Sequence, residues 1–89
     1  MTKAERKRMD RLAQLPCCCC GAYGVQLHHV REGQGMAQRA SNWLTIPLCP
    51  DCHTGSRGIH GDKSIMRQHK LDEMDLLART IESFDREYA

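Results

Sequence analysis

Aromatic residues are scarce in this 89-residue sequence: Trp43, Tyr23, Tyr88 and Phe84 are the only ones. A chain of this length forms at most one domain, and its hydrophobic core is only marginally stable unless a metal ion or disulfides support it. Because so few large apolar side chains are available, we expect an additional crosslink of this kind.

The sequence also lacks a long apolar run. No stretch approaches the roughly 18 apolar residues that cross a bilayer, and the basic start TKAERKRMDR is not followed by the apolar segment of a signal peptide. We therefore expect a soluble, intracellular protein with no membrane partner. In a reducing cytosol, six cysteines paired at two-residue gaps are more typical of metal ligands than of three disulfides.

Charge is unevenly distributed along the chain, although the formal net charge is only +2. Residues 1–16 contain five Lys/Arg and two acidic residues, whereas residues 70–89 contain three Lys/Arg and six acidic residues. The basic N-terminal region suits a polyanion, although a solvated helix face explains the same pattern. We expect residues 1–16 to form a basic N-terminal helix and residues 17–89 to form the functional domain.

The order of the expected elements is that of a small α+β domain. Thr2 with Glu5 is a capping-box pattern that begins the first helix, and Pro16 ends it. Residues 25–30 and 43–48 carry β-branched and apolar residues that predict two short strands.

The C-terminal part predicts two further helices. Asp62 is the expected N-cap of the first, and Asp72, with Asp75 three residues later, is that of the second, so the chain bends near residues 70–72. An apolar stripe follows at gaps of three and four residues and consists of Met74, Leu77, Ile81, Phe84 and Tyr88. We expect this stripe to pack on the core of a monomer; a dimer seam is the alternative.

Four cysteines form two C-x-x-C pairs, Cys17 with Cys20 and Cys49 with Cys52. Tetrahedral zinc accepts four thiolates at about 2.3 Å, and each C-x-x-C turn directs two sulfurs toward one point. Gly21 lets the chain leave the first turn with a positive φ angle. We therefore predict one closed structural Zn²⁺ site, which stabilises the domain.

Two more cysteines, Cys18 and Cys19, lie inside the first pair. We interpret them as spare thiols, because side chains inside the turn cannot easily face the same metal. Two alternatives remain open: a shifted set of ligands that includes one of them, and a redox switch formed by both. A redox switch requires a neighbour that lowers a thiol pKa, and no basic residue adjoins them in the sequence.

The five histidines have no role in a zinc tetrathiolate site. His28 and His29 are adjacent on the first predicted strand, so their side chains point to opposite sides. His53 directly follows the last cysteine, and His60 precedes the next predicted helix. We interpret His69, on that helix, as an ordinary surface or packing residue.

The order of a strand with a histidine pair, a loop, a second strand, a histidine and a helix is the one that a ββα-metal nuclease requires. In such a site one imidazole binds a divalent cation, while its neighbour stays off the metal and accepts a proton from water. Histidine suits both tasks because its pKa lies close to the working pH. The cation stabilises charge on the scissile phosphate.

The pattern C-x-x-C…LHHV…N…IPLC-x-x-CH resembles the zinc-knuckle branch of the HNH endonucleases. The segments QLHHVREGQGMAQRASNWLTIPLCPDCHTGSRGIHGD and DEMDLLARTIE are similar to the phage recombination-enhancement (Ref) nucleases, which act with the host RecA recombinase. The resemblance extends over residues 17–82. It implies a ββα-metal (HNH) core, DNA and a RecA filament as partners, and a phage- or prophage-encoded protein in the cytoplasm of a bacterial host cell.

By this resemblance, His28 holds the catalytic metal and His29 is the general base that activates water. Asn42 matches the middle Asn of the motif, which orients the base or braces the loop, and His53 and His60 supply the remaining metal-side histidines. HNH enzymes most often have Asp-His where this chain has His-His. Because Mg²⁺ prefers oxygen ligands whereas Zn²⁺ and Mn²⁺ suit imidazole better, the catalytic cation stays open among these three.

The resulting hypothesis is a metal-dependent DNA endonuclease with little sequence specificity, since no segment is typical of a base-reading helix. Phosphate contacts are expected from Arg31, Arg39, Arg57, Lys7 and Arg8. The alternative is a non-catalytic zinc-knuckle module that binds nucleic acid or protein. The grouped histidines argue against it, because a binding module needs no second cluster of metal-binding side chains.

Overall fold

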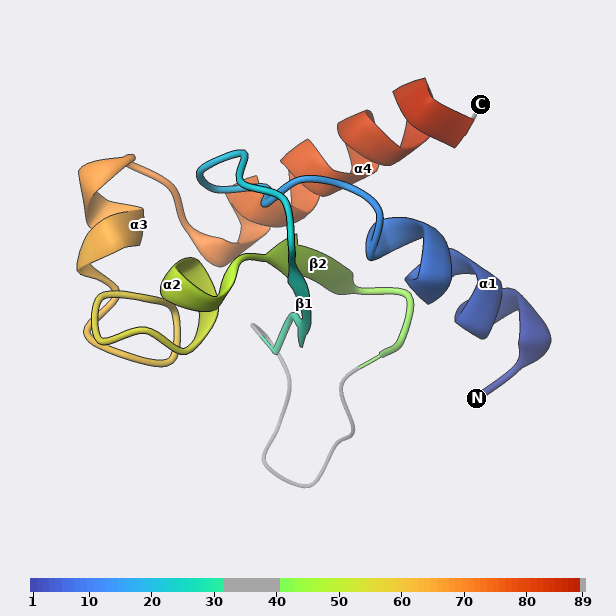
Figure 1. The fold of residues 1–89 in the computed structure, drawn as a ribbon, viewed down its shortest axis with the longest axis horizontal. Coiled ribbons are helices and arrows are strands. Elements are labelled where there is room, and N and C mark those ends of the chain that lie inside the picture. The colour runs from blue at the N-terminus through green and yellow to red at the C-terminus, as the bar shows by residue number, and fades with distance from the viewer. Residues whose placement is uncertain (32–40, 89) are drawn as a thin grey trace.

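The computed structural model describes residues 1–31 and 41–88. Their elements follow the order α1 (Lys3–Leu12), β1 (Gln26–His29), β2 (Thr45–Leu48), α2 (Pro50–His53), α3 (Ser64–Gln68) and α4 (Glu73–Tyr88). The two strands lie in the centre, with α1 at one end of the domain and α2 and α3 at the other, and α4 crosses beside them (Figure 1). The expected small α+β domain, with a basic N-terminal helix and C-terminal helices, is confirmed.

The two predicted strands pair as an antiparallel hairpin, in which Gln26 lies opposite Leu48 and His29 lies opposite Thr45. All four residues of β2 are buried, whereas His28 is the one buried residue of β1. β2 contacts both α1 and α4, so it forms the centre of the core. The position of His28 in β1 is therefore fixed by pairing with a strand that packs against two helices.

Helix α1 begins as the capping box predicts. The Thr2 hydroxyl accepts a hydrogen bond from the Glu5 backbone N–H at 3.1 Å, which satisfies one of the free donors of the first turn. The helix ends at Leu12, before Pro16 is reached, and Leu12 itself is fully buried. The acidic side chain of Glu5 stays at the helix start, where it is available to other partners.

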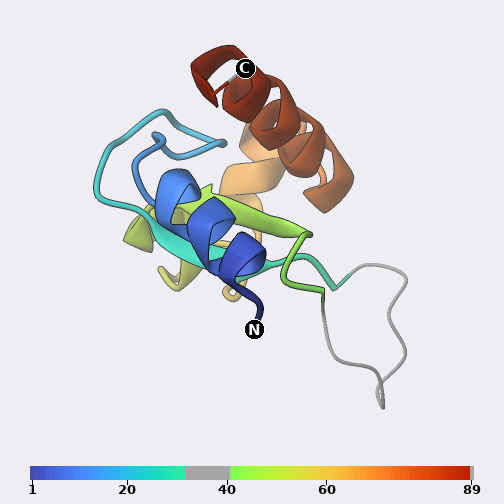
Figure 2. The same ribbon diagram turned by 90° about the vertical axis from the view of Figure 1, so that its right-hand side faces the viewer.

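Helix α4 returns toward α1 at its C-terminal end (Figure 2). The Tyr88 hydroxyl donates to the backbone oxygen of Arg11 at 3.1 Å, and the guanidinium of Arg8 lies 4.5 Å from the centre of the Phe84 ring. A cation above an aromatic face is attracted by the ring quadrupole. The first and last helices are therefore joined, and Arg8 serves in this contact.

The predicted start of α3 at Asp62 is wrong. Lys63 adopts a left-handed backbone conformation with φ of 61° and is itself the N-cap, so the helix begins at Ser64. The Asp62 carboxylate accepts from the Ser64 N–H at 2.8 Å. Asp62 thus stabilises the turn that precedes the helix, in the way that Asp side chains commonly do.

The predicted start of α4 is confirmed. The Asp72 carboxylate accepts from the Asp75 N–H at 2.8 Å, and the Asp75 carboxylate accepts from the Asp72 N–H at 3.0 Å. Lys70, with φ of 57°, makes the expected bend between α3 and α4. This bend directs the beginning of α4 toward β1.

The predicted apolar stripe of α4 is wrong in part. Met74 and Ile81 are 50% and 45% exposed, whereas Leu76 and Thr80 are fully buried together with Leu77. The predicted face and the buried face are adjacent on the helix. The buried face was not predicted because it includes Thr80, a polar residue. Its hydroxyl donates to the Leu76 backbone oxygen at 2.9 Å, so the residue enters the core without an unsatisfied donor.

Candidate metal centres

The four predicted cysteines come together in one cluster. The sulfurs of Cys17, Cys20, Cys49 and Cys52 all lie within 4.8 Å of one another, and the sulfurs of Cys20 and Cys49 are 3.5 Å apart. Four sulfurs at about 2.3 Å from a tetrahedral zinc are roughly 3.8 Å apart, so the cluster fits Zn²⁺. We refer to these four residues as the cysteine cage.

The backbone around the cage is held by the turn itself. The Gly21 N–H donates to the Cys17 oxygen at 2.8 Å, and the Cys20 N–H points at the Cys17 sulfur at 3.4 Å. Gly21 has φ of 83°, a conformation that other residues rarely adopt. The predicted exit from the turn is confirmed, and α2 provides the second half of the cage with Cys52.

Burial disfavours negative charge on Cys17 and Cys52 of the cage. Burial raises the pKa of Cys17, but hydrogen bonds from the backbone of Cys20, Cys49 and Cys19 outweigh burial and lower this pKa to about 7. Burial raises the pKa of Cys52, and the neighbouring thiol of Cys49 adds to this rise. A cation that neutralises the thiolates is therefore what the cage requires.

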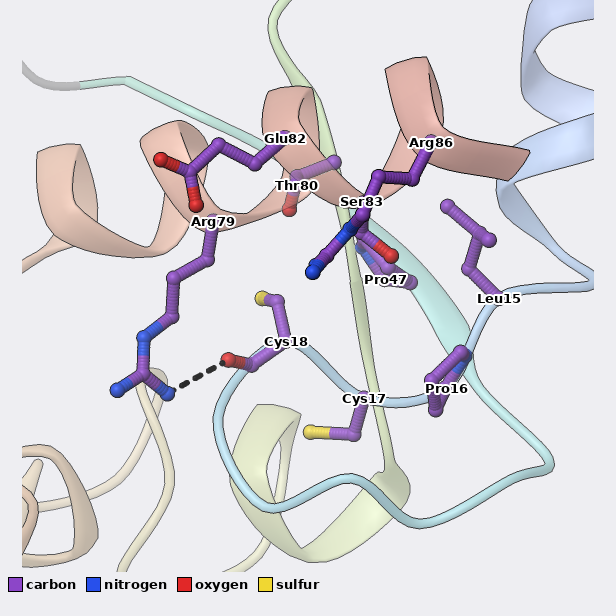
Figure 3. Close-up of a pocket in the computed structure, with 10 residues that line it drawn as sticks. All are labelled: Leu15, Pro16, Cys17, Cys18, Pro47, Arg79, Thr80, Glu82, Ser83 and Arg86. Carbon is purple, nitrogen blue, oxygen red and sulfur yellow. Dashed lines mark hydrogen bonds between the residues drawn. The ribbon is translucent and has the colours of Figure 1, made fainter. Parts of the chain in front are cut away.

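Cys18 and Cys19 do not belong to the cage. The Cys18 side chain points toward α4 into a cavity of about 310 Å³, away from the sulfur of Cys17 (Figure 3). Burial raises the pKa of Cys18 to about 12, although the Thr80 side chain acts in the opposite direction. Both thiols are free, and a thiol with so high a pKa is a poor nucleophile.

Three histidines form a second cluster, separate from the cage. The rings of His28 in β1, His53 at the end of α2 and His60 in the following loop are 4.7 to 5.3 Å apart between centres. One nitrogen of each ring lies within 4.8 Å of those of the other two. We refer to these residues as the histidine cluster. It is the second group of side chains among the described residues that fits a metal ion.

The loop that carries His60 is packed closely against α2. The His60 N–H donates to the His53 oxygen at 3.0 Å, and the Ile59 N–H donates to the Cys52 oxygen at 2.8 Å. A Cβ atom on Gly58 would lie 2.7 Å from the Asp51 backbone oxygen, so glycine is required at this close approach. The glycine-rich loop thus positions His60 next to His53.

Hydrogen bonds occupy one ring nitrogen of His28 and one of His53 in the histidine cluster. His28 Nε2 lies 3.1 Å from the Glu73 carboxylate, and His53 Nδ1 lies 2.8 Å from the Gln26 side-chain oxygen. A neutral imidazole that donates through one nitrogen keeps a lone pair on the other. His28 Nδ1 and His53 Nε2 are therefore the nitrogens available for a cation, and Glu73 and Gln26 orient their rings.

Two rings of the histidine cluster, those of His28 and His53, favour the neutral form. Burial lowers the pKa of His28, although the Glu73 carboxylate partly opposes this shift. Burial also lowers the pKa of His53, and the neighbouring His28 and His60 add to the effect. Neutral imidazole is the form that binds a metal ion, so the lowered pKa values of His28 and His53 favour metal binding.

His29 points to different partners from those of His28. Its Nε2 lies 2.9 Å from the Asn42 side-chain oxygen, and the Asn42 amide nitrogen donates to the Glu5 carboxylate at 2.6 Å. This hydrogen bond lowers the pKa of Glu5. The chain of contacts makes Asn42 an acceptor toward His29, which leaves His29 Nδ1 free to accept a proton.

Both histidines of the pair nevertheless line one open cavity. Its volume is about 190 Å³, and its walls are formed by Leu27, His28, His29, Arg31, His53 and His60. The cavity therefore combines three possible metal ligands with one histidine outside the ligand set. His69 lies exposed at the end of α3 and takes no part in this site.

The structure describes four of the five predicted DNA-contact residues, and these four have different surroundings. Arg31 lies on the wall of the cavity, and Lys7 is exposed on α1. Arg57 lies outside this wall and bonds to Ser64 at 3.0 Å. Arg8 packs on Phe84, so it is less available than predicted, and Arg39 lies outside the described residues.

Three residues that position the site were missed in the sequence: Gln26, Glu73 and Glu5. Glu73 and Glu5 lie in the first turns of α4 and α1, where acidic residues are common because they complement the helix dipole. Because the helix dipole already explains acidic residues at these positions, their contacts with His28 and Asn42 were not predicted. The sequence carried no signal for these two contacts, because each partner lies far away along the chain.

Residues 2–85 match the model of a protein family described as "Protein of unknown function (DUF968)". No curated protein and no solved structure matches the chain. None of the helices within residues 1–31 and 41–88 has the length and apolar character needed to cross a membrane.

Proposed function

The chain belongs to the DUF968 family of proteins of unknown function, and we propose that it is a metal-dependent DNA endonuclease of the HNH type. One observation carries the proposal: three metal-competent histidines and a fourth histidine, held by an asparagine, line the same open cavity. This arrangement suits phosphodiester hydrolysis, in which charge must be stabilised and a water molecule must lose a proton.

The histidine cluster would hold the catalytic cation. Three imidazoles favour Zn²⁺ or Mn²⁺ over Mg²⁺, although waters can complete an oxygen-rich shell for Mg²⁺. When bound, the cation supplies positive charge beside the scissile phosphate. Glu73 and Gln26 keep the rings of His28 and His53 oriented toward it.

His29 is the proposed general base. Its Nε2 is occupied by the Asn42 oxygen, so Nδ1 takes the proton from the attacking water. Glu5 holds the Asn42 amide in the orientation that presents oxygen to His29. The products carry a 5′ phosphate and a 3′ hydroxyl, as in the HNH nucleases that the sequence resembles.

DNA would reach the cavity along its positively charged rim. Arg31 is on the cavity wall, and α1, which provides Glu5 to the site, carries Lys7 and other basic residues on exposed positions. Contacts of this kind bind phosphates without reading sequence. We propose that a recombinase filament of the RecA type directs the nuclease to its DNA in a bacterial host cell.

The test is cleavage of plasmid and displaced-loop DNA with Mg²⁺, Mn²⁺ or Zn²⁺, with and without RecA. His29→Ala should lower the rate by at least about 100-fold, since general base catalysis contributes roughly 10²–10⁴. The fold and the cage zinc should be retained. His69→Ala is the matched control, because this histidine is exposed and outside the cavity.

Full activity in His29→Ala would show that His29 is not the general base. DNA binding without cleavage under all three cations would instead support a zinc-knuckle binding module.

A further inference from the structure

A second cavity adjoins the histidine cluster. Its volume is about 530 Å³, within the usual range of about 300–1,000 Å³ for small-molecule sites. It lies between α3, the start of α4 and Arg31, the second residue after β1. Three of its lining residues are apolar, Ile59, Met66 and Leu71, and three are cationic, Arg31, Lys63 and Arg67.

The two cavities share a wall. Arg31 lines both of them. The Glu73 carboxylate, which also lines the second cavity, accepts from the Arg31 backbone N–H at 3.0 Å and lies 3.1 Å from His28 Nε2. A group bound in the second cavity is therefore separated from the histidine cluster by one side chain.

The lining of the second cavity carries three positive and two negative side chains, so its net charge is +1. Arg31, Lys63 and Arg67 are exposed, and the Arg67 guanidinium donates to the Asp62 backbone oxygen at 2.9 Å. The Glu73 and Asp72 carboxylates each accept a backbone hydrogen bond within the protein. The apolar side is formed by the buried Ile59 and Met66.

We propose that this cavity is a nucleotide subsite. Given the proposed nuclease function, on which the identity of the ligand rests, the subsite binds the nucleotide next to the scissile phosphate. The base lies against Ile59, Met66 and Leu71, and its phosphate contacts the cations. A base can enter such a cavity only when it leaves the stack of a duplex, so the subsite selects DNA in which a base is unpaired or easily extruded.

The experiment uses zinc-loaded protein without a second metal and thymidine 5′-monophosphate as the probe. Titration should shift the methyl NMR signals of Ile59 and Met66, and should leave those of Met74 and Ile81, exposed on α4, unchanged. Thymidine and inorganic phosphate should each bind more weakly than the nucleotide. Thymidine lacks the phosphate that contacts the cations, and inorganic phosphate lacks the base that lies against the apolar residues.

Two variants test the cations separately. Arg67→Ala should weaken binding at least about tenfold, the effect of losing one charge-assisted contact. Lys63→Gly removes a second charge, and glycine suits the left-handed conformation at this position, so weaker binding cannot be attributed to unfolding. Arg86→Ala, in the distant C-terminal part of α4, is the control and should bind as the wild type does.

Unchanged Ile59 and Met66 signals, or equal affinity in Arg67→Ala and wild type, would overturn the subsite. The nuclease proposal is tested independently by cleavage. Nucleotide binding without any cleavage would support the nucleotide site and contradict the nuclease proposal. Cleavage without nucleotide binding would support the nuclease proposal and contradict the nucleotide site. His29→Ala should bind the nucleotide normally.

Discussion

The cysteine cage and the histidine cluster meet at the same short helix, α2, yet they differ in exposure. Three of the four cysteines are buried, and Cys20 alone is exposed. In the histidine cluster His28 is buried, His53 is half-buried and His60 is exposed. Closed tetrahedral sites are typical of structural zinc, whereas catalytic sites keep a position open to solvent. The comparison therefore favours a structural metal site in the cage, and it supports the proposal that the histidine cluster is the catalytic one.

The two clusters are coupled through adjacent residues. Cys52 and His53 are neighbours at the end of α2, and the Ile59 and His60 N–H groups bond to their backbone oxygens. Since zinc binding orders the backbone that carries its ligands, the cage also places His53 and His60. The dependence should run in one direction: losing the cage should destroy the histidine cluster, but losing a histidine should leave the cage intact.

The largest expected effect is the loss of a cage ligand. Cys52→Ser should release zinc and unfold the domain, because structural zinc contributes about 10–16 kcal/mol, comparable to the whole stability of a small domain, about 5–15 kcal/mol. Zinc analysis and circular dichroism measure both outcomes. Cys18→Ser, whose side chain faces α4, is the control and should keep zinc and fold. Full zinc in Cys52→Ser would show that the cage has other ligands.

A smaller effect is expected from a histidine ligand. His53→Ala should keep the fold and the cage zinc but lose affinity for the second cation by more than the roughly 10–100-fold that an outer-shell partner contributes. Competition titration with Zn²⁺ or Mn²⁺ measures this affinity. His29→Ala is the matched control, because His29 bonds to Asn42 and should not bind the cation. Loss of affinity in both variants would mean that His29 is also a ligand.

The smallest effect is expected from Glu73, which positions His28 without reaching the centre of the cluster. Glu73→Gln preserves the size and one acceptor but removes the charge, so the affinity for the second cation should fall about tenfold. Glu73→Ala should weaken it further, because His28 and the Arg31 N–H both lose their acceptor. Glu82→Gln, exposed on the same helix, is the control. Equal affinity in Glu73→Gln, Glu73→Ala and wild type would exclude the positioning role.

Features that depend on nearby residues were predictable from the sequence. The capping pairs of Thr2 with Glu5 and of Asp72 with Asp75 formed as expected, since each contact spans three residues. The start of α3 was not predictable in this way. It depends on the left-handed conformation of Lys63, and lysine seldom adopts that conformation, so the residue type does not indicate it.

The buried face of α4 shows a second limit. Apolar residue types mark two overlapping faces, and the true one includes Thr80, whose hydroxyl is satisfied within its own helix. Which face is buried depends on where β2 and α1 lie against the helix. A one-dimensional pattern does not contain that orientation.

By itself the sequence determined the cysteine pairs of the cage and the divergence of His28 from His29, because C-x-x-C spacing and strand alternation are properties of short backbone segments. His53 and His60 were expected in the cluster only from the resemblance to the HNH nucleases, since their approach to His28 depends on tertiary packing. Only the tertiary structure decided what holds the catalytic candidates in place. Glu73 reaches His28 across 45 residues, and Glu5 reaches Asn42 across 37. Such contacts exist because helices α1 and α4 pack on one hairpin, and their partners are set by the geometry of that packing.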